Sequence, residues 1–146
     1  MKFTTYIVAV IFMMFSAMAF SNDKSSIANR EQKLFECLKD KNNKSCFSNL
    51  LNDCTVVENL KIKKRRLSKM DTMFVDWLGD DSVFEIYHGK ERKIGNIIIS
   101  RDYIIEDTLA NRMLLKIKLE KQLGEWFIEH ISISTNSNEL KQALTP

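Results

Sequence analysis

The sequence contains little proline, glycine or histidine. Its 146 residues include one proline, four glycines and two histidines. So little proline and glycine excludes collagen-like proteins and glycine- or proline-rich scaffolds. The sequence also has no G-x-S-x-G, H-E-x-x-H, phosphate-binding-loop or dinucleotide-binding fingerprint. These absences argue against an enzyme, and we expect no cofactor and no metal site.

Long apolar runs are missing beyond the N-terminus. Residues 6–15 are all apolar, Lys2 precedes them, and Ala17 and Ala19 form the small-residue pattern that signal peptidase recognises. The run is shorter than the roughly 20 residues that span a bilayer. We expect residues 1–19 to be a cleaved secretory signal peptide rather than an uncleaved anchor. The expected location is the bacterial periplasm, with the extracellular space as the alternative, and no later segment predicts a transmembrane span.

The remaining composition is typical of one globular domain. The chain is 45% apolar and 28% charged, and its net charge of +3 is only mildly basic. The apolar fraction is too high for wholesale disorder, and the length suits one domain rather than two. We predict a single domain over residues 20–135 and a polar C-terminal tail over residues 136–146.

Three cysteines, Cys37, Cys46 and Cys54, follow the predicted signal peptide. Export leads to an oxidising compartment, where three cysteines can form at most one internal disulfide. We expect Cys46 and Cys54 to share a helix, which would hold their Cα atoms about 12 Å apart, too far for a disulfide. In an antiparallel helical hairpin, Cys46 lies nearly level with Cys37. We therefore predict a Cys37–Cys46 disulfide, which leaves Cys54 as a buried thiol or an intermolecular link. Three reduced core cysteines are the alternative.

The apolar residues change their period near residue 80. Before it they recur with helical spacing in three segments, which begin near Ser25, near Ser45 and at Leu67, with Ser68 as a cap. After it they alternate as in strands, over residues 83–87, 94–99, 103–106, 113–120 and 125–134. The second and third of these segments are either two strands or one strand with a bulge at 100–102. Helices followed by strands predict an α+β fold, with three N-terminal helices packed on a four- to five-stranded antiparallel meander sheet.

The last predicted hairpin carries a short recognisable pattern. Leu123-Gly124-Glu125 leads into Trp126-Phe127-Ile128, and Ile131 follows. This end of the chain, together with the order of helices and strands, resembles the nuclear-transport-factor-2-like superfamily, in which many secreted members close with a similar strand. The resemblance implies a bent sheet around N-terminal helices, with a pocket or a protein-binding sheet. It transfers no functional residue, because no family motif matches residue by residue.

The most unusual stretch of the chain is basic. Six of the nine residues 61–69 are Lys or Arg. On a helix these cations point all round the axis, unlike the face of a membrane-binding amphipathic helix. We interpret the stretch either as solvated charge or as a contact for an acidic protein or for the phosphates of lipid or lipopolysaccharide. Export argues against nucleic acid. The candidate contact residues are Lys63, Lys64, Arg65 and Arg66.

Trp77, Trp126 and His130 are the candidates for lining a pocket. The two tryptophans lie on periodic apolar faces and are first of all core residues. Strict alternation in the last strand places Trp126 and Ile128 on one face and Phe127, Ile131 and Ile133 on the other. His88 is expected in a surface turn. The acidic residues Asp71, Asp76, Asp80 and Asp81 are interpreted as capping and turn residues rather than as a cation site.

Three functions follow from these features. The first is an exported, non-catalytic binding protein that acts by protein–protein contact, such as an immunity protein or an inhibitor of a toxin or hydrolase. The alternative is a periplasmic carrier of a lipid or small apolar ligand. The third is a small pocket enzyme that uses a carboxylate and His130. The missing catalytic fingerprints favour the first.

Overall fold

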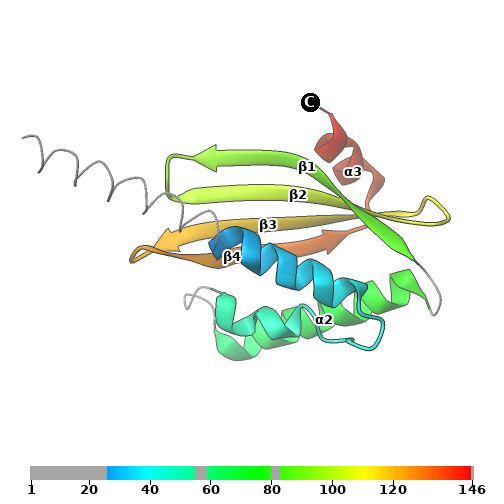
Figure 1. Ribbon diagram of the computed structural model, residues 1–146, viewed down its shortest axis with the longest axis horizontal. Coiled ribbons are helices and arrows are strands. Elements are labelled where there is room, and N and C mark those ends of the chain that lie inside the picture. Colours follow the sequence, from blue (N-terminus) through cyan, green and yellow to red (C-terminus); the bar gives the residue numbers. More distant parts are fainter. Residues whose placement is uncertain (1–25, 55–58, 80–82, 146) are drawn as a thin grey trace, which may run out of the picture. The chain divides into compact units, whose positions relative to one another are not determined.

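The structure is a computed structural model that describes residues 26–54, 59–79 and 83–145 (Figure 1). The predicted signal peptide, residues 1–19, lies outside the described residues. The chain divides into two compact units, Met1–Lys33 and Leu34–Pro146. In the first unit, residues 26–33 are helical, and this helix continues to residue 39 in the second unit, as the apolar period predicts.

The second unit is built on a four-stranded antiparallel sheet. Its strands are β1 (Phe84–Ile94), β2 (Ile98–Asp107), β3 (Arg112–Gln122) and β4 (Glu125–Ser134), and their spatial order is the order of the sequence. Short turns join each strand to the next, so the sheet is a meander (Figure 1). The predicted α+β class, with helices before an antiparallel meander, is confirmed.

One face of the sheet, called the inner face here, carries most of the core. In β3 the buried side chains Leu115, Ile117 and Leu119 alternate with the partly exposed Lys116 and Lys118. In β2, Tyr103 pairs with Leu115 and therefore shares the inner face. The ring of Tyr103 lies 4.9 Å from that of Phe35, in the helical residues that precede the disulfide. The alternating pattern of β3 therefore predicts its buried face correctly.

A bulge in β4 changes which side chains share a face. Lys118 pairs with His130, whereas Leu119 pairs with Ile128, so Glu129 is an extra residue in β4. One extra residue shifts the alternation by one position. The expectation that Trp126 opposes Ile131 is therefore wrong. Four buried side chains of β4 share the inner face: Trp126, Ile128, Ile131 and Ile133.

A second bulge lies in β1. His88 pairs with Tyr103 and Glu91 pairs with Arg101, so Gly89 and Lys90 together oppose a single residue of β2, Asp102. His88 is thus a strand residue and not the turn residue that we expected. The turn lies further along, at residues 95–97, and β2 runs without a bulge through residues 100–102.

The second and third helical segments differ from the prediction. In place of a helix from Ser45 there is a short 3₁₀ helix, η1 (Ser48–Asp53), after which Cys54 pairs with Ile128 of β4 as an isolated bridge. The following helix, α2 (Leu60–Leu78), begins well before Leu67. Asn59 caps this start, because its side chain accepts a hydrogen bond from the backbone N–H of Lys61 at 2.9 Å.

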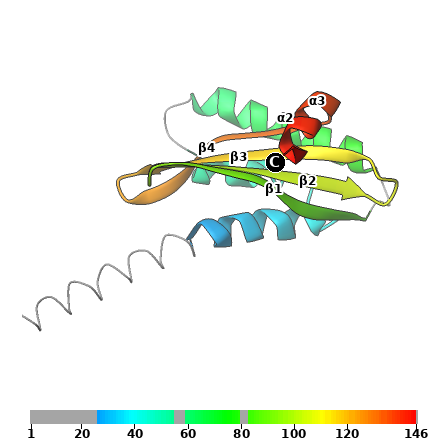
Figure 2. The ribbon, with the colours of Figure 1, turned by 90° about the horizontal axis from the view of Figure 1, so that it is seen from above.

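The C-terminal residues form a helix and not the polar tail that we expected. This helix, α3 (Ser137–Leu144), is capped by Asn136, whose side chain accepts hydrogen bonds from the next turn. Ala143 and Leu140 pack on Ile104 and Leu114, a cross-strand pair on the outer face of the sheet. Because these two outward-facing apolar residues need a cover, the end of the chain folds onto them (Figure 2).

Candidate functional site

The exposed side of α2 carries a row of cations, called the basic face here. Lys61, Arg65 and Lys69 follow one another at intervals of four residues and lie on one side of the helix, with Lys64 beside them. All four side chains are exposed. None of them makes an ion pair with a carboxylate among the residues that the structure describes.

The basic face differs from the four residues proposed from the sequence. Lys64 and Arg65 belong to it, as expected. Lys63 is only 4% exposed and lies on the buried side of α2, and Arg66 is half-buried. The six cations therefore do point around the axis of α2, as expected, but the four exposed ones lie on one side of it. Lys61 and Lys69 were not among the four candidates. Both lie four residues from Arg65, so a helix that starts at Leu60 would have placed them on the same side as Arg65.

Large apolar side chains border the basic face. Ile62 is 60% exposed and Leu60 is 66% exposed, both in the first turn of α2. Met73 is 42% exposed, one turn after Lys69. The basic face therefore has exposed apolar side chains near both of its ends.

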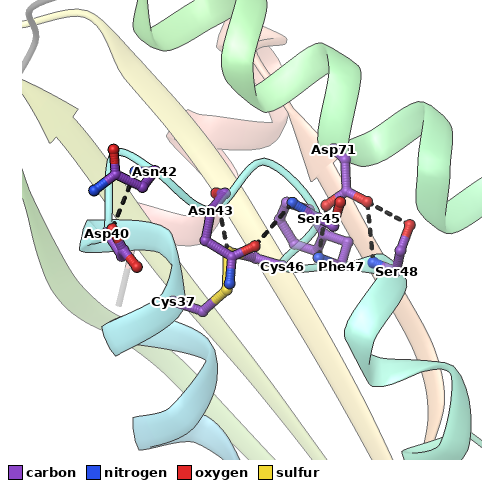
Figure 3. The surroundings of a disulfide bond; sticks show 9 residues. All are labelled: Cys37, Asp40, Asn42, Asn43, Ser45, Cys46, Phe47, Ser48 and Asp71. Carbon is purple, nitrogen blue, oxygen red and sulfur yellow. Dashed lines mark hydrogen bonds between the residues drawn. A yellow bond between two sulfur atoms is a disulfide. The ribbon is translucent and has the colours of Figure 1, made fainter.

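The opposite side of α2 is anchored by Asp71 (Figure 3). Its carboxylate accepts hydrogen bonds from the backbone N–H groups of Phe47, at 2.7 Å, and Ser48, at 3.0 Å, and from the Ser48 hydroxyl. The rings of Phe47 and Phe74 pack edge to face with centroids 6.1 Å apart. Asp71 is therefore an anchor for η1, and not the capping or turn residue that we expected.

The segment that Asp71 holds is also covalently fixed. The sulfur atoms of Cys37 and Cys46 lie 2.09 Å apart and the Cα atoms 5.6 Å apart, which is the geometry of a disulfide. This is the pairing that the spacing predicts. Cys54 is buried and takes no part in it. The expectation that Cys46 and Cys54 share a helix is wrong, since Cys46 precedes η1 and Cys54 follows it.

A small open cavity lies beside the disulfide loop, with a volume of about 120 Å³. Its apolar lining includes Leu38, Phe74 and Leu78, and Lys41 and Lys44 are among its polar residues. Cavities that hold small molecules measure roughly 300–1,000 Å³, so this one has room for a group of side-chain size.

Two of the three residues predicted to line a pocket, Trp126 and His130, lie on opposite faces of the sheet. Trp126 is buried on the inner face of β4, whereas His130 is exposed and pairs with Lys118 on the outer face. The bulge at Glu129 separates them, because it reverses the alternation between the two residues. Trp77 lies on α2, with its ring 6.1 Å from that of Phe74.

The predicted acidic cluster is also dispersed. Asp71 is buried in the anchor, and Asp76 is exposed on α2. Asp80 and Asp81 lie outside the described residues. Within the described part of the chain, no three His, Cys, Asp or Glu side chains are placed to hold a metal ion.

Comparison with known proteins identifies the fold and no closer relationship. No protein-family model and no curated protein matches the chain. Among solved structures, the chain is similar to a domain of unknown function with a cystatin-like fold from Nostoc punctiforme PCC 73102. The TM-score is 0.53 at 12% sequence identity, over 83% of this chain and 82% of that chain. The fold is cystatin-like. A cystatin-like fold does not by itself specify a function, since unrelated functions share folds.

Among the described residues, no helix has the length and apolar character needed to cross a membrane.

Proposed function

We propose that this cystatin-like protein is an exported, non-catalytic binding protein that contacts an acidic surface of a protein partner through the basic face. The observation that supports the proposal is the row formed by Lys61, Arg65 and Lys69. Like charges four residues apart on a helix destabilise it by roughly 0.2–0.5 kcal/mol per pair. The carboxylates of an acidic partner would attract all three cations and so offset this repulsion.

The residues around the row favour a protein as the partner. Arg65 and the apolar Ile62 lie within one turn of each other, and Met73 follows Lys69 by one turn. Protein interfaces combine an apolar centre with Arg and a polar rim. Clustered cations also accelerate the encounter with an acidic surface. The anchor at Asp71 fixes the helix before binding, which reduces the entropy lost on association.

The alternative functions receive less support from the geometry. The cavity of about 120 Å³ is small for a lipid. His130 lies on the outer face of the sheet, away from that cavity's lining residues, so it does not line a pocket with Trp126.

The test compares two charge-reversed variants of the protein purified gently from the cells that make it. The first is Lys61→Glu/Arg65→Glu/Lys69→Glu. The matched control, Lys39→Glu/Lys41→Glu/Lys44→Glu, changes the net charge equally at other exposed positions. Native mass spectrometry is the readout, and circular dichroism checks that both variants keep their helices.

We expect wild type and control to carry a protein at fixed stoichiometry, and the first variant to have lost it. The complex should also dissociate as the salt concentration rises, because salt screens exposed charges. A complex that survives in the first variant, or a wild-type protein that carries no partner, would contradict the proposal.

A further inference from the structure

The two hairpin turns at one end of the sheet expose aliphatic side chains. Leu123, in the β3–β4 turn, is 106% exposed, and Ile97, in the β1–β2 turn, is 58% exposed. Ile94, the last residue of β1, is 67% exposed. Figure 1 places both turns at the same end of the sheet. These three residues are called the apolar tip.

A hydrogen bond joins the β1–β2 turn to the end of β3. The backbone N–H of Lys121 donates to the carbonyl of Ile97 at 2.8 Å. Lys121 lies two residues before Leu123, so the β1–β2 turn is held beside the end of β3 that leads into the β3–β4 turn. The three residues of the apolar tip therefore gather at one end of the sheet, at two turns whose backbones are held together.

Leu123 occupies an unfavourable backbone conformation. Its φ is 50°, and with Gly124 at φ 88° it forms a two-residue turn with both residues in the left-handed region. Asn, Asp and Gly are the residues that suit this position, and Leu does not. A fully exposed Leu at a strained position contributes no packing within the described chain. An energetic cost of this kind is a reason to look for a role in binding.

Cations lie just behind the apolar tip. The ammonium group of Lys121 lies 5.8 Å from the centre of the Trp126 ring. Glu91 is paired with both Lys93, at 2.8 Å, and Arg101, at 2.6 Å, so that cluster keeps a positive charge. The hydrogen bond from Lys93, together with Arg101, holds the pKa of Glu91 below its ordinary value. Glu125, which follows the turn, is the exposed carboxylate nearest in sequence to Leu123.

We propose that the apolar tip binds the surface of a bilayer that contains anionic phospholipid. Leu123, Ile97 and Ile94 enter the boundary between headgroups and acyl chains. Lys93 and Lys121 stay at the level of the lipid phosphates, since their long side chains let the charge remain in the polar layer. Insertion of apolar side chains and attraction to anionic lipid are the two terms that hold a peripheral protein on a membrane. This site is separate from the basic face and does not depend on the proposed protein partner.

The test measures cosedimentation with vesicles. The protein is recovered from the cells that make it, and mass spectrometry ensures that all variants have the same N-terminus. One set of vesicles contains phosphatidylglycerol and phosphatidylcholine, and the other contains phosphatidylcholine alone. The test variant is Ile97→Asn/Leu123→Asn. The control is Leu109→Asn, which changes a leucine that is 79% exposed in the β2–β3 turn, at the opposite end of the sheet (Figure 1).

We expect wild type and control to bind the anionic vesicles equally, and the test variant to bind about tenfold more weakly. Wild type should bind the neutral vesicles more weakly than the anionic ones. The thermal midpoint of the test variant should not fall, because Asn suits the left-handed position better than Leu. A thermal midpoint equal to that of wild type would show that a loss of binding does not come from unfolding.

Four results would overturn the proposal. They are no binding by wild type, equal binding to neutral vesicles, unchanged binding by the test variant, and an equal loss in the Leu109→Asn control. Sedimentation velocity without vesicles identifies the other possible occupant. If the test variant abolishes a dimer and wild type binds no vesicles, a second copy of the chain covers the apolar tip.

Discussion

Replacing Asp71 by Asn removes the charge that anchors α2 to η1. The carboxylate is 8% exposed and accepts three hydrogen bonds, from the backbone N–H groups of Phe47 and Ser48 and from the Ser48 hydroxyl. An Asn side chain keeps one acceptor oxygen and presents an NH₂ group in place of the other. At least one backbone N–H of η1 then faces a donor and loses its partner.

The magnitude follows from these contacts. A hydrogen bond to a charged group contributes roughly 1.5–3 kcal/mol, and a buried N–H left without a partner costs roughly 1–3 kcal/mol. Since the remaining bonds also lose their charge assistance, we expect Asp71→Asn to lower the free energy of unfolding by about 3 kcal/mol. A domain of this size has roughly 5–15 kcal/mol in total, so the variant should still fold. Its thermal midpoint should fall by about 10 °C.

Urea unfolding measures the effect, and a double-mutant cycle assigns it. Ser48→Ala alone should cost about 1 kcal/mol, and in the Asp71→Asn background it should cost less, because its partner has changed. Asp76→Asn is the matched control, an exposed Asp on the same helix that should change the stability by less than about 0.5 kcal/mol. A cost below about 1 kcal/mol for Asp71→Asn, or one equal to that of the control, would refute this account of the anchor.

Three further predictions concern the loop, the β1 bulge and the β2–β3 turn. Replacing Cys37 and Cys46 by Ser should destabilise the protein by about 2.6 kcal/mol in urea unfolding, the loop-closure entropy for a separation of nine residues; a loss below about 1 kcal/mol would contradict it. Gly89→Ala should lower the free energy of unfolding by about 1–3 kcal/mol, because its Cβ would lie 2.9 Å from the carbonyl oxygen of Asp102; a thermal melt that matches wild type would be the contrary result. The side chain of Asn111 hydrogen-bonds Asp107 and, with two backbone N–H groups, lowers the pKa of that carboxyl in the folded state. The ionised Asp107 therefore stabilises the fold fully above its unfolded-state pKa, and this stabilisation is lost as the pH falls through the lower folded-state pKa. The difference in free energy of unfolding between wild type and Asp107→Asn should narrow below about pH 4; a difference that widens there would contradict the prediction.

The sheet could be predicted where one rule of local structure was enough. Alternation in β3 identified Leu115, Ile117 and Leu119 as the buried side, because one face of that strand meets the core and the other meets solvent. The Cys37–Cys46 disulfide was also predicted correctly, although the shared helix that was to exclude a Cys46–Cys54 pairing does not exist. Both features depend on residues that are close in the sequence.

The bulges could not be predicted from the sequence pattern. In β4, the alternation of side chains between the two faces is interrupted at Glu129, which has no pairing partner in β3. The pairing with β3, and not the sequence of β4 alone, determines which residue forms the bulge. The failure placed His130 on the other face of the sheet from Trp126. The helix expected from Ser45 failed for a similar reason, because Asp71, more than twenty residues away, binds the backbone of that segment. Long-range contacts override local preference in both places.

Two of the four cations of the basic face, Lys64 and Arg65, were predicted from the sequence. Composition identified the stretch, but choosing the exposed cations required the start of α2, and the cap at Asn59 sets it. A start at Leu60 puts Lys61, Arg65 and Lys69 in one row, whereas a start at Leu67 leaves the first two outside the helix. Errors at a helix boundary therefore propagate directly into the prediction of a site.

The meander order of the sheet has a consequence for how the protein reaches its folded state. Every strand pairs with its neighbour in the sequence, so each hairpin can form before the next without closing a long loop. The disulfide likewise joins cysteines that are nine residues apart. Contacts of this short range are typical of domains that fold quickly. An unfolded chain would therefore expose its apolar strands only briefly, and Cys54 would be covered by β4 soon after the last hairpin closes.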